Sequence, residues 1–222
     1  MRISHALAGA ALVCTSLSSA AAQSGPPQSG QPPSARPAVT AEAIIAASDA
    51  DGHFYAEPSD DPAFVQARSL RSGLRCRFDI EAGGRITVFP SRPGATAPGD
   101  DVGCNTPSGA NQITLYATRY GVPTSTSAQL EEAVVAIRER FEVRKELRAT
   151  TPARPHDVGI RTFLICRDDG VLATRVAVAI VDGWVLKMRF TGAEAALPTA
   201  DKLWAEALAD FEGAGRAVRP GI

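Results

Sequence analysis

The stretch GIRTFLICRDDGVLATRVAVAIVDGWVLKMRFT, residues 159–191, decides the fold. It holds three apolar runs that are separated by two turn signals. Asp182-Gly183 lies between the last two runs, and Asp-Gly between apolar runs is a strong signal of a two-residue hairpin turn. Gly170 follows two aspartates and marks the earlier turn. The stretch therefore predicts three consecutive antiparallel strands, a meander.

Alternation within the meander predicts which side chains share a face, because successive side chains of a strand point to opposite faces. One face of the last run carries Trp184, Leu186, Met188 and Phe190, and one face of the middle run carries Leu172, Val176, Val178 and Ile180. The aromatic residues Trp184 and Phe190 could form a platform for a ligand. We interpret them as core, the usual place for large apolar side chains.

Two amphipathic helices flank the meander in the sequence. The first is predicted to begin at Thr126, as N-cap of a capping box with Gln129, and to run to Phe141. The second begins near Pro198, and Gly213 is expected to end it. Residues 143–150 could be helix or strand. The predicted fold is α+β: an antiparallel sheet with the C-terminal three-strand meander, covered by both helices on the face of Trp184 and Phe190.

The N-terminal half predicts shorter elements. We expect a helix over 40–49, strands over 64–70, 74–78, 85–90 and 112–120, and a loop over 91–103. Residues 39–111 form an N-terminal segment that bears a disulfide, and residues 112–215 form a second α+β segment. About 180 residues follow the first 38, and this length suits one domain that contains both segments.

The first 38 residues predict export. Residues 1–22 have the charge, the apolar run and the small residues of a secretory signal peptide, and residues 23–38 form a Pro/Gly/Ser-rich linker that we expect to be disordered. The protein is then periplasmic or secreted. As an alternative, Cys14 could be the lipidated N-terminus of a membrane-anchored lipoprotein. Membrane contact is expected only in that case.

Three cysteines follow the predicted signal peptide: Cys76, Cys104 and Cys166. An exported chain meets an oxidising compartment, so one disulfide and one remaining thiol are expected. Cys76 and Cys104 are nearest in sequence and are predicted to pair. Cys166 ends an apolar run, and we interpret it as a structural thiol rather than a reactive one.

Charge is balanced, with a formal net charge of −1, and this argues against a nucleic-acid-binding protein. Four arginines nevertheless lie within ten residues that contain no acid: Arg68, Arg71, Arg75 and Arg77. They could form a patch for an anionic ligand or for lipid headgroups. Solvated strand faces would explain them equally well.

No catalytic or metal-binding signature occurs in the sequence. His53 and His156 lie far apart, there is no Cys-x-x-Cys pair, and nucleophile, zinc-protease and nucleotide-binding motifs are missing. We therefore expect a protein without enzymatic activity, cofactor or metal.

Two resemblances follow from the quoted residues. The order strand, helix, strands and helix after residue 112 resembles the PsbP/Mog1-like fold, which implies an accessory factor that binds other proteins. The segments SGLRCRFD, GDDVGCNT, LYATRY and VDGWVLKMRFT resemble a family of exported bacterial proteins of unknown function. This second resemblance also implies the Cys76–Cys104 pairing. The expected function is a non-catalytic module that binds another envelope protein. A periplasmic carrier of a small or anionic ligand is the alternative, and a hydrolase without a recognisable motif comes third.

Overall fold

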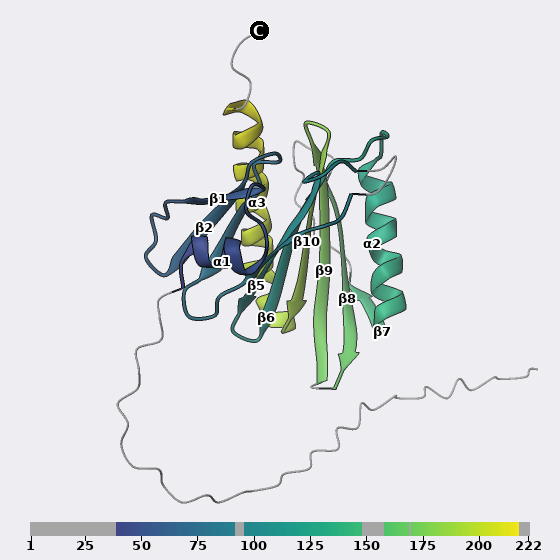
Figure 1. Cartoon of the computed structure of the whole chain (residues 1–222). Helices are drawn as coiled ribbons and strands as arrows, with labels where there is room; N and C mark the ends of the chain where they lie inside the picture. Colours follow the sequence, from purple (N-terminus) through teal and green to yellow (C-terminus); the bar gives the residue numbers. More distant parts are fainter. Residues whose placement is uncertain (1–38, 92–95, 148–157, 169, 218–222) are drawn as a thin grey trace, which may run out of the picture.

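A computed structural model describes residues 39–91, 96–147, 158–168 and 170–217 as an α+β fold with two antiparallel sheets (Figure 1). The elements in chain order are α1 (Ala41–Ala47), β1 (Phe54–Glu57), β2 (Phe64–Ser69), β3 (Arg75–Asp79), β4 (Arg85–Val88), β5 (Asp101–Ser108), β6 (Asn111–Thr118), α2 (Thr126–Arg140), β7 (Glu142–Leu147), β8 (Val158–Arg167), β9 (Gly170–Val181), β10 (Trp184–Gly192), the short 3₁₀-helix η1 (Glu194–Ala196) and α3 (Leu197–Ala217). The small sheet has the order β1-β2-β3, and the large sheet has the order β4-β5-β6-β10-β9-β8-β7.

Strands β8, β9 and β10 are neighbours at the middle of the large sheet. Asp182 and Gly183 connect β9 to β10 with φ angles of 48° and 80°, the left-handed values that a two-residue type I′ turn requires. β10 then pairs with β6 on its other side, with Phe190 opposite Ile113. This long-range pairing joins the C-terminal strands to the N-terminal half.

The two long helices lie on opposite faces of the large sheet, so the prediction that both cover one face is wrong. On β9, Val176 and Val178 contact the core under α2, while Ala177 and Ala179 contact the core under α3. The side chains of α2 in its core are Leu130, Val134 and Ile137, and those of α3 are Trp204, Leu208 and Phe211. Each apolar face must be removed from water, so the sheet needs cover on both sides.

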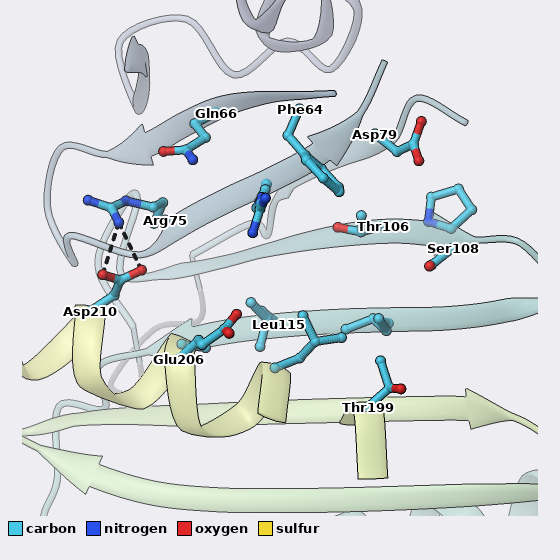
Figure 2. A pocket seen from close by; sticks show the side chains of 15 residues that line it. Phe64, Gln66, Arg75, Asp79, Thr106, Ser108, Leu115, Thr199, Glu206 and Asp210 are labelled. Atoms are coloured by element: carbon cyan, nitrogen blue, oxygen red, sulfur yellow. Dashed lines mark hydrogen bonds and ion pairs between the residues drawn. The ribbon is translucent and has the colours of Figure 1, made fainter. Parts of the chain in front are cut away.

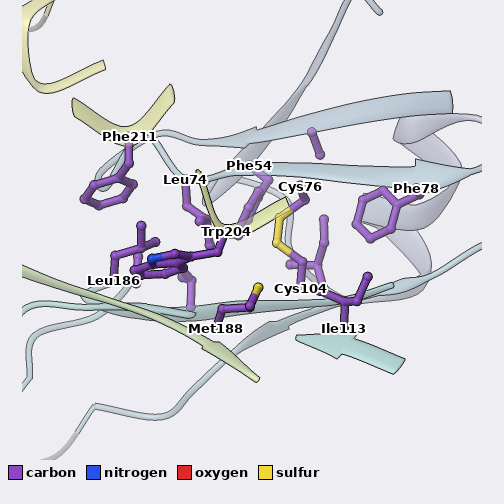
Figure 3. Close-up of a cluster of buried hydrophobic side chains, with 14 of the residues drawn as sticks. Phe54, Leu74, Cys76, Phe78, Cys104, Ile113, Leu186, Met188, Trp204 and Phe211 are labelled. Carbon is purple, nitrogen blue, oxygen red and sulfur yellow. A yellow bond between two sulfur atoms is a disulfide. The ribbon is translucent and has the colours of Figure 1, made fainter. Parts of the chain in front are cut away.

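The small sheet and α1 pack on the same face of the large sheet as α3 (Figures 1 and 3). The inward side chains of β3 include Cys76 and Phe78, which are fully buried. Cys76 forms a disulfide with Cys104 of β5, with 5.8 Å between the Cα atoms. The predicted pairing is confirmed, and the bond ties the small sheet to the large one.

Several element ends differ from the prediction. The expected loop over 91–103 is shorter, because β5 begins at Asp101, which pairs with Thr118 of β6. Residues 142–147 form strand β7, on the edge of the large sheet. The N-cap of α2 is Ser125, whose hydroxyl accepts from the amide of Ala128. α3 continues through Gly213; the buried face of this helix offsets the cost of about 1 kcal/mol for an interior glycine.

The expectations for residues 1–22 and 23–38, for Cys14 and for His156 lie outside the described residues. The expected boundary at residues 111–112 falls at the start of β6, which is paired with β5 along its length.

Candidate functional site

A groove of about 330 Å³ runs between the small sheet, the β5–β6 hairpin and α3 (Figure 2). Its apolar lining comes from Phe64, Ile113, Leu115, Leu203 and Ala207, and its charged lining from Arg75, Arg77, Asp79, Glu206 and Asp210. The groove contains two of the four arginines that the sequence singled out. It is therefore the first candidate for a binding site.

Strand register explains why arginines line this groove. β2 pairs with β3 so that Arg68 lies opposite Arg75, while the adjacent pair, Ala67 and Cys76, is buried in the core. Paired residues of antiparallel strands point to the same face. Arg68, Arg75 and Arg77 consequently share the outer face of the small sheet.

Carboxylates hold the guanidiniums on this face. Arg75 donates to both carboxylate oxygens of Asp210 at 2.9 Å and, through Nε, to Glu57 at 2.8 Å (Figure 2). Arg68 donates to the other oxygen of Glu57 at 2.8 Å. Glu57 thus bridges two arginines, and Asp210 ties α3 to β3.

Arg77 and Arg71 are also paired, at separate places. Arg77 donates to Asp61 at 2.7 Å and stacks over the ring of Phe64, 3.8 Å from its centroid. Arg71 lies beyond the end of β2, where it forms an ion pair of 2.9 Å with Asp100. The structure therefore brings three of the four arginines together. An anionic-ligand patch stays a prediction, and the carboxylate partners reduce the positive charge available to a ligand.

The pKa of Glu57 reports the balance of forces in this cluster. Burial raises the pKa of Glu57, but hydrogen bonds and charge attraction from Arg68 and Arg75 outweigh it, so the pKa lies below its ordinary value of 4.5. Glu57 is therefore ionised at neutral pH, and the cluster acts as an ion-pair network.

The other candidates that the structure describes, Cys166 and His53, lie in different parts of the fold. Cys166 is half-buried in β8 and outside the disulfide, and His53 is half-buried beside Gly99. Within the described ranges, no group of three or more His, Cys, Asp or Glu side chains could hold a metal ion. In the same ranges, no helix has the length and apolar character needed to cross a membrane.

A second hollow was not foreseen from the sequence. Arg140, Arg167 and Arg189 surround a pocket of about 130 Å³ on the α2 face of the large sheet. These arginines come from α2, β8 and β10, and between 20 and 30 residues separate each from the next along the chain. A search for local clusters of arginine cannot find them. The one local sign is that Lys187 and Arg189 alternate with the apolar residues of β10, which puts both cations on the face opposite Trp184 and Phe190.

Comparisons with known proteins add little to this geometry. No family model matches the chain, and no curated protein does. Among solved structures, a protein of unknown function from Pseudomonas aeruginosa, whose description suggests a regulator, is similar with a TM-score of 0.35 and 11% identity over 71% of this chain and 94% of its own. The solution structure of the cyanobacterial PsbP from Synechocystis is similar with a TM-score of 0.37 and 10% identity over 71% of this chain and 91% of its own. Scores of this size carry no argument about function.

Proposed function

We propose that the protein is a non-catalytic binding module of the cell envelope, and that its groove holds an apolar side chain of a partner protein. The observation that carries this proposal is the apolar floor of the groove, built from β6 and α3 and framed by ion pairs. The volume of about 330 Å³ is at the small end of the range of roughly 300–1,000 Å³ for ligand sites. It suits one or two side chains.

Charge around the groove favours a basic neighbour for that side chain. Three cations, Arg68, Arg75 and Arg77, face five acids, Glu57, Asp61, Asp79, Glu206 and Asp210. The arginines are engaged by Glu57, Asp61 and Asp210, which leaves Asp79 and Glu206 at the rim. Glu206 has only a long, exposed ion pair of 3.7 Å with Lys202 of the same helix. Complementary charge steers association and fixes register. The expected partner segment therefore carries an apolar residue beside a lysine or arginine.

The disulfide supports the envelope location. Structural disulfides form in oxidising compartments and are rare in reducing ones, and Cys76–Cys104 closes a connection of 28 residues between two sheets. Together with the signal-like first 22 residues, it favours an exported protein.

A carrier of a small apolar molecule is the second candidate, because the groove alone could enclose such a ligand. Both functions use the same apolar floor of the groove. They differ in the mass of the species that stays bound to the protein. In a carrier, α3 would contact the ligand directly through Leu203 and Ala207. In a protein-binding module, these residues would contact a polypeptide.

Native mass spectrometry of the tagged protein recovered from its own envelope tests the proposal. The Ala207→Trp substitution fills the groove, and Val135→Trp, on the exposed surface of α2, is the matched control. We expect a second polypeptide on the wild type and on V135W but not on A207W. Retention of the polypeptide by A207W would overturn the proposal for the groove. A small-molecule mass that only A207W loses would instead make the protein a carrier.

A further inference from the structure

Three arginines converge on the second hollow, and none of them has an acidic partner among the described residues. Arg189 projects from β10, Arg140 ends α2, and Arg167 ends β8. Within the described part of the chain, none of the three forms a hydrogen bond or an ion pair through its guanidinium. Of the acids next to them in sequence, the described ones, Glu139, Glu142 and Asp168, form no ion pair with them either. On the small sheet, by contrast, Arg68, Arg75 and Arg77 are each paired with a carboxylate.

The sheet register builds the floor of this pocket from polar side chains. Asn105, Thr114 and Arg189 are paired across β5, β6 and β10, so they form one row on the same face. Gln112 and Thr191 form the next row. α2 packs over β7, β8 and β9 and leaves this row uncovered. The pocket therefore lies where the helix ends and the bare sheet begins.

No acid in the described ranges relieves the charge repulsion in this pocket. Burial lowers the pKa of Arg189, and the positive charge of Arg140, together with the weaker effect of Arg167, lowers it further. Arg140 and Arg189 both lie over the ring of Phe141, with 5.7 and 5.0 Å between guanidinium carbon and ring centroid. Phe141 holds the two cations near each other. Groups that repel one another and are kept together are typical of a site whose ligand supplies the opposite charge.

Size and donor chemistry define the ligand. A volume of about 130 Å³ holds roughly four water molecules at ~30 Å³ each, which is close to the size of one tetrahedral oxyanion. Guanidiniums form paired hydrogen bonds with the oxygens of phosphate. The amides of Asn105 and Gln112 and the hydroxyls of Thr114 and Tyr116 add neutral donors to the lining of the pocket. A phosphate group with two negative charges neutralises more of the charge of the three arginines than a single carboxylate does.

We propose that Arg140, Arg167 and Arg189 form a binding site for a phosphate group, carried either by a soluble phosphate compound or by a lipid headgroup. The site is on the opposite face of the large sheet from the groove and does not depend on the function proposed for the groove. Arg189 supplies the half-buried central charge. The exposed Arg140 and Arg167 close over the phosphate from the ends of α2 and β8.

Titration calorimetry with inorganic phosphate at low salt tests the site in the full chain. We expect saturable binding that R189M weakens about tenfold or more, because a charge-assisted contact is lost. The control is Lys202→Met on α3, which removes one exposed positive charge on the opposite face of the large sheet and should leave the affinity unchanged. Arg167→Met is the second test variant, since its exposed side chain can be shortened without disturbing the core.

The outcomes separate the two sources of phosphate. Binding of free phosphate that R167M and R189M weaken, without sedimentation with vesicles, supports a soluble phosphate compound. Sedimentation with phosphatidic acid vesicles but not with phosphatidylcholine vesicles, lost in the same variants, supports a headgroup. Binding to neither probe, or equal loss in K202M, would overturn the site. A207W should bind phosphate normally, so failure of the groove proposal leaves this result intact.

Discussion

Two groups of arginines on this protein have the same chemistry and opposite surroundings. Arg68, Arg75 and Arg77, on the small sheet, are each held by a carboxylate at 2.7–2.9 Å. Among the described residues, Arg140, Arg167 and Arg189 have no such partner. The residues of the first group are close together in the sequence, which predicts them as a patch for an anionic ligand. The second group is scattered in sequence and is the better candidate for binding an anion.

The difference shows that acids decide what an arginine cluster does. A paired guanidinium contributes to stability, and its charge is cancelled before a ligand arrives. An unpaired and partly buried guanidinium costs stability and keeps its charge for a ligand, the trade-off expected at a functional site. Four substitutions or conditions test this contrast, beginning with the one that should change stability most.

Removing the disulfide should have the largest effect, and it concerns the paired region. The C76A/C104A variant loses the bond between β3 and β5, which closes 28 residues. The chain-entropy model gives a loss of about 3–4 kcal/mol in the free energy of unfolding. Urea unfolding measures it. A loss below about 1 kcal/mol would mean that packing alone holds the small sheet in place.

Removing a paired arginine comes next. In R75M, Glu57 keeps only Arg68 and Asp210 loses its partner. Because hydrogen bonds to partly buried charged groups contribute about 1.5–3 kcal/mol when fully formed, and Arg75 and Asp210 are partly exposed, we expect a loss of about 1–2 kcal/mol in urea unfolding. An unchanged midpoint would show that the ion pairs of the small sheet contribute nothing to stability.

Removing an unpaired arginine should leave the free energy of unfolding unchanged or raise it slightly. R189M deletes a half-buried charge that Arg140 repels, and the apolar stem of methionine fills part of the space. Replacing unfavourable buried charge by apolar groups is often neutral or stabilising, so we expect a gain of about 0–1 kcal/mol by the same method. Destabilisation by more than about 1 kcal/mol would place Arg189 in the structural class with Arg75.

Lowering the pH should reduce the contribution of the paired cluster to the free energy of unfolding. We expect this to be the smallest of the four effects. The folded-state pKa of Glu57 is lower than its ordinary value of 4.5, so its stabilising contribution is fully present above pH 4.5 and is lost as the pH falls through the lowered value. The difference in unfolding free energy between wild type and E57Q should shrink over that range. E139Q, on an exposed position of α2, is the control and should show no such convergence.

Local patterns predicted the strands well where the strand signal was strong. The alternation from Trp184 to Phe190 and the turn at Asp182-Gly183 correspond directly to β10 and its hairpin. β5 was missed in part, because its residues 101–108 include glycine, proline and asparagine, which are unfavourable in strands. Its pairing with β4 and β6 overrides that preference.

Three-dimensional placement was harder to predict. The apolar sets led by Val176 and by Leu186 could be read from the sequence, but pairing puts Leu186 opposite Ala179, and so on the other face from Val176. Helices α2 and α3 therefore cover opposite faces of the large sheet. The partners of Arg75, and the meeting of Arg140 with Arg189, depend on contacts between distant segments that no local spacing encodes.

The pairing of β6 with β10 has a consequence for how the chain folds. Ile113 must find Phe190, 77 residues later, whereas β8, β9 and β10 meet through short turns. Because loop closure must precede such distant contacts, we expect the meander to form early and the β6–β10 seam to form late. During synthesis from the N-terminus, β6 exists before its partner does, with one edge open to wrong pairings. A chaperone that shields this edge would therefore act on the nascent N-terminal half.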